Sequence, residues 1–542
     1  MRIIIIGAVA AGTSAAAKAR RNDEDAEIII YDKDSFISYS GCGMPYYIGG
    51  EVESVEQLTP RDSAFFKSKY NVDIFIRHEV LSIDPGKKIL QIKNIQTGDI
   101  IQDFYDKLVI ATGASAIVPP IKGADQKNVF TLRNISDMKQ IKAYMNENAP
   151  GSAVIAGTGF IGLEVCENLK ELGIEVTLIE RLPQVTPGLD KDMAVYVEEH
   201  LKKHGVKLFK GISVVEIREN KVILEDNSEV EADFVILSTG VRPNTELAVK
   251  AGIELGITGA IKVNEKMMTN VKDIYACGDC SEQFHVVTRK PVYRPMGSTA
   301  NKTGRICGDV ITGGNLSFKG ILGTGIFKVF DMTVALTGLS EREAKLEGYS
   351  VVVCHSMKPN KPEYMGGKEM LIKGIADKDT KRLLGVQIVG FEGVDKRIDV
   401  FATAITYKAQ VEDLFHLDLA YAPPFSTTKD PVMYTGMILE NAIQTNRKLI
   451  SSEELKELIA SGKKYQLIDA RVASQYEKNH IETAINIPHT KLREEMDKLD
   501  KQVLTITYCN KGVTGNAAQN ILLNNGFCEV YNLSGGHRNY RK

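Results

Sequence analysis

Two cysteines stand in settings that suit sulfur chemistry. Cys42 lies between Gly41 and Gly43, in the segment SFISYSGCGMPYYIGG at residues 35–50, which holds no second thiol. A lone thiol cannot close an internal disulfide, so it would alternate between a thiolate and a bond to a small thiol, a sulfane sulfur or oxygen. Pro45 suits the first turn of a helix, whose dipole is expected to lower the pKa of the Cys42 thiol. A buried structural cysteine is the alternative.

The second cysteine, Cys509, ends a predicted strand at residues 503–508 and opens the loop CNKGVTG. Loop N–H groups followed by a helix N-terminus can hold a thiolate or a persulfide, so Cys509 is a candidate carrier of sulfane sulfur. Cys277 and Cys280 form a C-x-x-C pair. Since no second pair of ligands accompanies them, they are interpreted as packing residues, and no metal site is expected.

The segment that precedes Cys42 is typical of a dinucleotide-binding unit. Gly7 permits a tight turn, Gly12 follows at the start of a helix that offers free N–H groups to a pyrophosphate, and Asp32 would bind ribose hydroxyls. Val9 stands where the fingerprint has its middle glycine, so an ordinary α/β unit is the alternative at this point. The predicted elements are two strands and the helix between them, at residues 3–6, 26–31 and 10–21.

A second copy of this unit is complete. A predicted strand at residues 152–156 leads into the three fingerprint glycines, Gly157, Gly159 and Gly162. The next strand ends at Glu180, whose carboxylate favours free ribose hydroxyls and therefore NADH over NADPH, although the adjacent Arg181 could partly compensate. Two such units in one chain imply two dinucleotides, and the usual pair is FAD reduced by a nicotinamide.

Three further segments have a shared pattern: LVIATG at 108–113, VILSTG at 235–240 and IYACGD at 274–279. Each reads as a strand that ends in a small-residue turn or an acid. With the two nucleotide units, they resemble flavoprotein disulfide reductases that have two dinucleotide domains. The resemblance implies that Asp279 binds the ribityl chain of the flavin. It also implies that Thr112 and Gly240 lie where the chain crosses between the two domains.

The Cys42 segment, with AVA in the first glycine turn, resembles coenzyme A disulfide reductases. The resemblance implies that Cys42 is the redox cysteine, that FAD and NADH or NADPH are the cofactors, and that coenzyme A is a ligand or substrate. Gly41 replaces an asparagine that many members place on that ligand. The candidate contacts to coenzyme A are Lys18, Arg21 and Ser38, with Lys69 as a further basic residue.

Residues 320–446 resemble the dimerisation domain of that family, in which each subunit completes the active site of the other. Tyr421, in AYAPPFS, matches a tyrosine that lies near the cysteine of the partner subunit, where a phenol could protonate a leaving thiolate. Tyr364 occupies a second tyrosine position. The resemblance implies a homodimer, and packed aromatic side chains are the alternative role for both tyrosines.

The C-terminal segment resembles a rhodanese domain and follows a polar joint at residues 447–452. Its motifs are LIDAR, HIETAINIP, CNKGVTG and NLSGG. The resemblance places Cys509 at the sulfur-carrying position. Thr514 stands where an arginine is common, and Lys511 is the nearby residue that could supply positive charge. A purely structural rhodanese domain is the alternative.

The predicted fold class is α/β, with two Rossmann-like FAD and NAD(P) domains, an α+β dimerisation domain and a C-terminal rhodanese α/β domain. The expected boundaries are 1–112 with 240–319 for FAD, 113–239 for NAD(P)H, 320–446 for dimerisation and 451–542 for rhodanese. The 542 residues carry 67 Lys+Arg against 69 Asp+Glu, so neither nucleic acid nor a membrane surface is expected as a partner. Eight scattered cysteines favour a reducing cytoplasm over a disulfide scaffold.

The leading functional hypothesis is an enzyme in which NADH and FAD reduce a mixed disulfide at Cys42. Its substrate would be coenzyme A disulfide, coenzyme A persulfide or polysulfide, and Cys509 could feed it sulfane sulfur. An NADH oxidase or peroxidase that cycles Cys42 through a sulfenic acid is the second hypothesis. Ala10 disfavours it, because those relatives carry a histidine at that position. A non-catalytic flavin and thiol redox sensor is the third.

Overall fold

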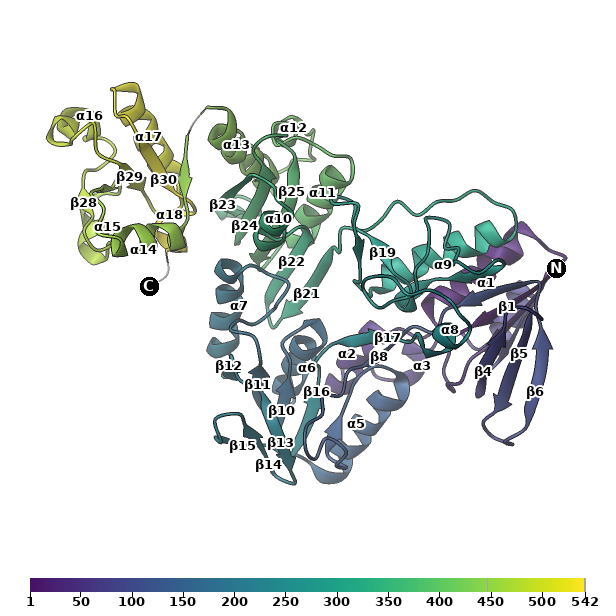
Figure 1. The fold of residues 1–542 in the computed structure, drawn as a ribbon. Coiled ribbons are helices and arrows are strands. Elements are labelled where there is room, and N and C mark those ends of the chain that lie inside the picture. Colours follow the sequence, from purple (N-terminus) through teal and green to yellow (C-terminus); the bar gives the residue numbers. More distant parts are fainter. Residues whose placement is uncertain (446, 541–542) are drawn as a thin grey trace. The chain divides into compact units, whose positions relative to one another are not determined.

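The computed structural model describes residues 1–445 and 447–540. Asn446 and Lys542, which end two of the predicted domains, lie outside the described residues. The chain divides into two compact units: unit 1 is residues 1–187 with 198–323, and unit 2 is residues 188–197 with 324–542 (Figure 1). No helix in the described part of the chain is both long enough and apolar enough to cross a membrane.

The first sheet of unit 1 is a five-stranded parallel sheet around β1. Its strand order is β18-β7-β1-β2-β3, and Ile3 to Ile6 of β1 are all buried. Isoleucine runs that are buried on both faces are typical of parallel strands covered by helices. The strands are β1 (Arg2–Ile6), β2 (Glu27–Tyr31), β3 (Val72–Phe75), β7 (Lys107–Ile110) and β18 (Ile274–Ala276).

Two helices of unit 1 approach each other closely because both carry small residues. Helix α1 (Ala10–Asn22) is rich in alanine, and α9 (Gly297–Ile311) meets it through glycines. A Cβ atom on Gly304 would lie 2.2 Å from the Ala11 carbonyl oxygen, and one on Gly308 would lie 2.2 Å from that of Ala15. Larger residues would therefore push α9 away from the helix that follows the first glycine turn.

The second parallel sheet of unit 1 has the order β12-β11-β10-β16-β9. Strand β10 (Ser152–Ala156) occupies the residues predicted for it, and helix α6 (Phe160–Glu171) follows directly. The remaining strands are β9 (Val129–Phe130), β11 (Glu175–Glu180), β12 (Lys207–Lys210) and β16 (Phe234–Leu237).

Unit 2 begins with a five-stranded antiparallel sheet of order β21-β22-β25-β24-β23. Helix α13 (Pro431–Gln444) packs on it through Thr435, since a Cβ on Gly374 of β24 would lie 2.7 Å from the Thr435 methyl carbon. The α+β fold predicted here is confirmed. The strands are β21 (Gly325–Val329), β22 (Met332–Gly338), β23 (Val351–Pro359), β24 (Glu369–Asp377) and β25 (Leu383–Gly390).

The C-terminal part of unit 2 is a parallel sheet of order β26-β30-β29-β27-β28. The prediction of a polar joint at residues 447–452 is wrong in one respect, because Leu449 and Ile450 form strand β26, which pairs with β30. Two apolar residues are enough to extend an existing sheet edge. A run of two is too short to show the periodicity by which a strand is recognised in a sequence. The strands are β26 (Leu449–Ile450), β27 (Gln466–Asp469), β28 (Ile485–Asn486), β29 (Thr505–Tyr508) and β30 (Val530–Leu533), and the main helices are α14 (Ser452–Ala460) and α17 (Val513–Asn524).

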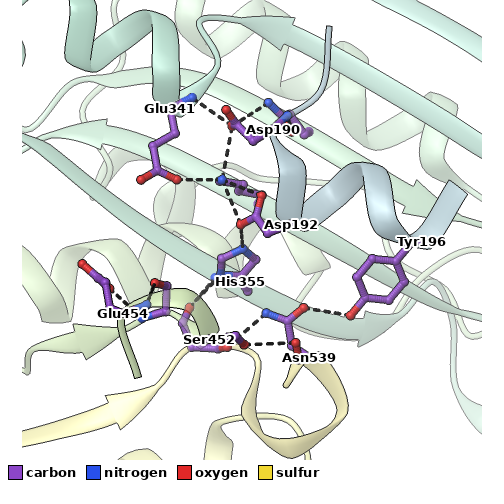
Figure 2. Close-up of polar contacts among 12 residues, drawn as sticks. Asp190, Asp192, Tyr196, Glu341, His355, Ser452, Glu454 and Asn539 are labelled. Carbon is purple, nitrogen blue, oxygen red and sulfur yellow. Dashed lines mark hydrogen bonds and ion pairs between the residues drawn. The ribbon is translucent and has the colours of Figure 1, made fainter. Parts of the chain in front are cut away.

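A buried ion-pair network fastens residues 188–197, which include the first turns of α7 (Lys191–Lys203), to the antiparallel sheet (Figure 2). The Nζ atom of Lys373 on β24 lies 2.8 Å from Asp192, 2.7 Å from Glu341 and 3.2 Å from Asp190. Asp192 also lies 2.7 Å from Nε2 of His355. The Lys373 side chain is almost wholly buried, so the surrounding carboxylates compensate its charge.

Candidate active site

The first glycine turn is as tight as its sequence predicts. Gly7 has φ +108°, and a Cβ at this position would lie 2.2 Å from the Ala111 carbonyl oxygen. A Cβ on Gly12 would lie 1.9 Å from the Gly7 carbonyl oxygen. These contacts hold the start of α1 directly over the end of β1, where its free N–H groups can receive a phosphate.

The second turn repeats this arrangement with Gly157 and Gly162. Gly157 has φ +107°, and a Cβ on Gly162 would lie 2.3 Å from the Gly157 carbonyl oxygen. Gly159 differs, because no atom outside Gly159 and its two chain neighbours lies within 4 Å of the position its Cβ would take. That open space is what the close approach of a pyrophosphate to the backbone requires.

The predicted ribose-binding acids end their strands and are buried. The Asp32 carboxylate accepts the Ala8 N–H at 2.6 Å, and Glu180 accepts the N–H and hydroxyl of Thr158 at 3.0 and 2.7 Å. Each acid therefore holds its own glycine turn in shape. A carboxylate has further lone pairs, and those that remain can accept ribose hydroxyls.

Thr112 and Gly240 lie at the two chain crossings between the parallel sheets of unit 1. Strands β8 (Ala114–Ala116) and β17 (Val241–Pro243) pair in antiparallel fashion there. The Thr112 hydroxyl donates to the Asn244 carbonyl at 2.7 Å, and the Gly240 carbonyl accepts the Ile117 N–H at 2.9 Å. These bonds tie the two crossings together.

Cys42 is exposed in a short helical turn, Gly41–Gly43, that leads into α2 (Met44–Gly49). The expectation that a helix dipole lowers its pKa is wrong. Helix α2 has only six residues, whereas desolvation by the neighbouring residues raises the pKa of the Cys42 thiol and the Glu164 carboxylate raises it further. Arg133 acts in the opposite direction and favours the thiolate.

Glu164 and Arg133 belong to the surroundings of Cys42, and sequence reasoning missed both. Burial and the neighbouring Glu167 raise the pKa of Glu164 to about 7, so this carboxyl group exchanges its proton near neutral pH. The Arg133 guanidinium forms an ion pair with Asp279 at 2.7 Å. The sequence shows Glu164 only as a charged residue in the helix after the second glycine turn, and nothing in that pattern indicates that it lies near Cys42.

Cys277 and Cys280 are wholly buried in the core of unit 1, as their interpretation as packing residues requires. The thiol of Cys280 donates to the Cys277 carbonyl at 3.3 Å. All eight cysteines, each of which lies in the described part of the chain, are free.

The candidate coenzyme A residues divide into a paired and an exposed set. Lys18 forms an ion pair with Asp309 at 3.0 Å. Arg21 and Lys69 are exposed and lie over the ring of Tyr70, at 5.6 Å each from its centroid. Ser38 has φ +48°, and its N–H donates to the Ala8 carbonyl of the first glycine turn at 2.8 Å. Exposed cations around an aromatic ring suit an anionic ligand that carries an aromatic base.

The two candidate tyrosines lie on the surface of unit 2. Tyr421 is 49% exposed in the loop before α13, and Tyr364 is 76% exposed in the turn Glu363–Met365 between β23 and β24. Neither is packed inside the chain. Exposed phenols of this kind are available to a second subunit.

The second candidate site is a cavity of about 440 Å³ at Cys509. Cys509 follows β29, and α17 begins four residues later at Val513. The Cys509 carbonyl accepts the His537 N–H at 2.7 Å, and a Cβ on Gly536 would lie 2.4 Å from that carbonyl oxygen. The NLSGG motif therefore packs directly against the Cys509 loop, and only a glycine at position 536 leaves space for the Cys509 carbonyl group.

The basic residues that line this cavity have acidic partners. Arg471 forms a buried ion pair with Asp469 at 2.6 Å. Lys511 forms an ion pair with Glu369 of β24, and Arg538 reaches the same carboxylate at 2.7 Å. Thr514 lines the cavity as well. The positive charge expected from Lys511 is thus partly neutralised by Glu369 of the antiparallel sheet.

Comparison with known proteins identifies the family. A family model described as pyridine nucleotide-disulphide oxidoreductase matches residues 1–302. The chain belongs to this family. The model of the family's dimerisation domain matches residues 325–431 of this oxidoreductase, and a rhodanese-like domain model matches residues 451–542.

Three relatives of this oxidoreductase are similar over most of its length. The NAD(P)H sulfur oxidoreductase (CoA-dependent) of Pyrococcus furiosus is 38% identical over 81% of the chain and 99% of the relative. The structure of reduced Bacillus anthracis CoADR-RHD has a TM-score of 0.97 at 39% identity and covers 99% of the chain and 97% of that protein. A NAD-dependent persulfide reductase from A. fulgidus has a TM-score of 0.92 at 38% identity, with full coverage of both chains.

FAD and NAD(P)H are the cofactors of this family of oxidoreductases, and the chain fits both. The glycine turns at Gly7 and Gly157 present helix N-termini, and the open space at Gly159 admits a phosphate. Asp32 directly follows β2 and Glu180 ends β11, so these two carboxylates are the residues that would accept ribose hydroxyls.

Proposed function

We propose that this protein is an FAD-dependent NAD(P)H reductase of coenzyme A disulfide, coenzyme A persulfide or polysulfide, with a rhodanese domain that handles sulfane sulfur. One observation carries this proposal: an exposed thiol, Cys42, follows the first nucleotide unit with no second cysteine in its segment, and the same chain holds another thiol, Cys509, in a cavity of about 440 Å³. The relatives whose names include CoA-dependent sulfur reduction and persulfide reduction support it.

The thiolate of Cys42 attacks the substrate at the coenzyme A sulfur. With a persulfide, hydrosulfide leaves and a mixed disulfide forms between Cys42 and coenzyme A, whereas with coenzyme A disulfide the leaving group is coenzyme A thiolate. Bound FAD supplies the two electrons, taken from NADH, that cleave this mixed disulfide. In balance, NADH, one proton and coenzyme A persulfide give NAD⁺, coenzyme A thiol and hydrogen sulfide.

In this proposal Arg133 contributes a positive charge near Cys42, and Glu164 contributes a group that exchanges a proton. The positive charge of Arg133 favours the Cys42 thiolate. Glu164, with a pKa of about 7, can hold or release a proton beside the departing sulfur at neutral pH. Lys18, Arg21, Ser38 and Lys69 bind coenzyme A in this proposal.

The active unit is a cytoplasmic homodimer in this proposal. Tyr421 and Tyr364 of one subunit lie near Cys42 of the other and protonate its leaving thiolate. The exposure of both phenols supports this role. The eight free cysteines support a reducing compartment.

The test is anaerobic turnover of the FAD-loaded protein with NADH, comparing coenzyme A persulfide with coenzyme A disulfide while released sulfide is assayed. We expect turnover of both, faster persulfide turnover with stoichiometric sulfide, and no turnover in Cys42→Ser. Loss of neither activity in Cys42→Ser contradicts the proposal. Turnover of hydrogen peroxide alone would support a peroxidase instead.

The role of Cys509 is tested with Cys509→Ser in the same assay. This variant should lose turnover with sulfur delivered from thiosulfate and keep turnover of coenzyme A disulfide, because only the first route passes through the rhodanese domain. Equal losses on both substrates contradict a relay of sulfur between the two cysteines.

A further inference from the structure

Tyr364 lies in a turn that is closed by hydrogen bonds at its base. Residues 360–368, between β23 and β24, form this Tyr364 turn. The Asn360 N–H donates to the Lys368 carbonyl at 2.9 Å, and the Asn360 side-chain oxygen accepts the Lys368 N–H at 2.8 Å. Asn360 is buried, whereas Tyr364 is exposed. The phenol is therefore positioned by whatever holds the buried base of the turn.

Tyr421 lies in a second loop that is exposed at its tyrosine and buried at its other end. The Tyr421 loop, residues 421–430, leads into α13. The Ser426 N–H donates to the carbonyl of Ala422, the residue after Tyr421, at 3.1 Å. The Ser426 hydroxyl donates to the Asp430 carboxylate at 2.7 Å, and both side chains are buried. The position of Tyr421 thus depends on how Ser426 and Asp430 are held.

The guanidinium group of Arg397 contacts the buried ends of both loops. Its Nη2 atom lies 2.9 Å from the Asn360 carbonyl oxygen of the Tyr364 turn. The same atom lies 2.8 Å from the Asp430 carboxylate and 3.2 Å from the Ser426 hydroxyl, both in the Tyr421 loop. The side chains of Arg397 and Asp430 are only 2% and 3% exposed. Water therefore does not compete for these bonds, and one side chain joins the two loops.

The position of Arg397 is set by the start of its own helix. Arg397 is in the first turn of α11 (Val394–Thr406), and its Nη1 donates to the Gly393 carbonyl at 3.1 Å. Gly393 has φ +71°, and a Cβ there would lie 2.4 Å from Nη1, so a glycine leaves the space that the guanidinium occupies. Asp430 caps the start of α13 and accepts the Val432 N–H at 3.0 Å. The link between the loops is thus anchored on two helices.

Stability alone does not explain an arginine at this place. The cost of desolvating two buried charges offsets much of their attraction, so well-packed apolar residues often give similar or greater stability. An apolar side chain has no donors with which to hold a carbonyl, a hydroxyl and a carboxylate in one arrangement. A guanidinium group does, because it is planar and directs its N–H groups at fixed angles. The purpose of Arg397 is therefore sought in what the two loops carry.

We infer that Arg397 is a positioning residue for the sulfur reduction, because its guanidinium group holds the Tyr364 turn and the Tyr421 loop in one relative arrangement. Both phenols are then held together for use at the cysteine of the partner subunit. Since Arg397 is buried, it acts through the two loops and not on the substrate. This inference rests on the tyrosine step of the proposed function and names the residue that positions both tyrosines.

The first measurement is hydrogen exchange of the full-length, FAD-loaded protein, comparing Arg397→Lys with the parent. Lysine keeps the charge that compensates Asp430, but its single nitrogen cannot replace the planar fork that contacts both loops. The amides of Asn360, Lys368 and Ser426 should therefore exchange about tenfold faster in Arg397→Lys, because both loops open more often. Parental exchange rates in both loops overturn the inference.

Ser426→Ala separates the two loops. It removes the hydroxyl contact of the Tyr421 loop and keeps the contacts of Arg397 with Asn360 and Asp430. The amide of residue 426 should exchange faster in this variant, whereas that of Asn360 should keep its parental rate. The matched control is Arg382→Lys, which changes a half-buried arginine just before β25 in the same unit. It should leave both loops unchanged.

The second measurement is coenzyme A disulfide reduction per FAD-loaded dimer. Arg397→Lys should lower kcat about tenfold and leave the KM for NADH unchanged, because misplaced phenols slow only the chemical step. In a background that carries both Tyr364→Phe and Tyr421→Phe, Arg397→Lys should cause no further loss, since it acts through those two phenols. A merely structural role predicts the same loss in both backgrounds, and that result overturns the inference.

The failure of the inference is distinguishable from the failure of the tyrosine step. If Tyr364→Phe and Tyr421→Phe keep the parental kcat, the tyrosine step of the proposed function is wrong and the inference falls with it. If they lose activity while Arg397→Lys keeps it, the inference alone is wrong. Should Arg397→Lys fail to fold, Ser426→Ala replaces it: its loss of kcat must disappear in the Tyr421→Phe background, and a loss that persists there overturns the inference.

Discussion

At the scale of single residues, the two thiols were predictable and their electrostatic partners were not. Cys42 and Cys509 sit in local motifs that the chain order displays directly. Arg133 and Glu164 approach Cys42 from segments about ninety and one hundred and twenty residues further along, so only tertiary packing reveals them. For the same reason, the local argument from a helix dipole gave the wrong direction for the pKa of Cys42.

Glu164 should impose a pH dependence on the reactivity of Cys42. Its pKa of about 7 means that it is neutral at pH 6 and charged at pH 8, where its charge disfavours the thiolate. Glu164→Gln should therefore speed alkylation of Cys42 at pH 8 about three- to tenfold and leave the rate at pH 6 nearly unchanged. The measurement is the alkylation rate of the Cys42 peptide across this pH range.

The raised pKa of Glu164 also predicts how the free energy of unfolding changes with pH. Because the folded-state pKa of Glu164 lies above its ordinary value, the folded state binds more protons between about pH 4.5 and 7. Its contribution to the free energy of unfolding is present below that window and is lost as the pH rises through it. Relative to Glu164→Gln, the parent should lose stability over this range, whereas Glu171→Gln, at the exposed end of α6, should follow the parent.

At the scale of elements, glycine spacing and strand periodicity predicted the two nucleotide units within one or two residues. Strand β10 matches its predicted range, and α1 extends one residue beyond it. The network around Lys373 has no such signal. Its acids come from the loop before α7, from α7 itself and from the start of α10 (Glu341–Leu346), and a lysine inside an apolar strand shows no partner in the sequence.

Lys373→Met should destabilise unit 2 strongly, because it leaves Asp190, Asp192 and Glu341 without their shared cation. Removing one partner from a buried ion-pair network costs about 3–5 kcal/mol. The control, Lys345→Met, removes an exposed partner of Glu341 and should cost less than about 1 kcal/mol. The chain has no tryptophan, so the readout is hydrogen exchange of the β24 amides, which should lose protection in Lys373→Met alone.

At the scale of the whole molecule, the proposed function requires two copies of the chain to form each active site. The family's dimerisation model matches residues 325–431, and both candidate tyrosines, Tyr364 and Tyr421, lie within this range and are exposed. Sequence resemblance supplied this expectation. A local pattern could not have done so, because an exposed tyrosine on a loop has many explanations.

Mixed dimers test whether the tyrosine acts across the interface. Cys42→Ser and Tyr421→Phe should each be impaired in coenzyme A disulfide reduction as homodimers. Remixing equal amounts should restore about a quarter of the parental activity, because half of the dimers then hold one intact site formed by Cys42 of one subunit and Tyr421 of the other. If Tyr421 acts on Cys42 of its own chain, no activity returns on mixing.

The two-residue strand β26 decides where the C-terminal domain can be cut free. A fragment that starts at Ser451, where the rhodanese-like match begins, would lack Leu449 and Ile450 and leave the backbone of β30 unpaired along one edge. Open strand edges recruit other chains and promote aggregation. A fragment that starts at Arg447 keeps β26 paired with β30. We therefore expect the longer fragment to remain soluble and the shorter one to aggregate.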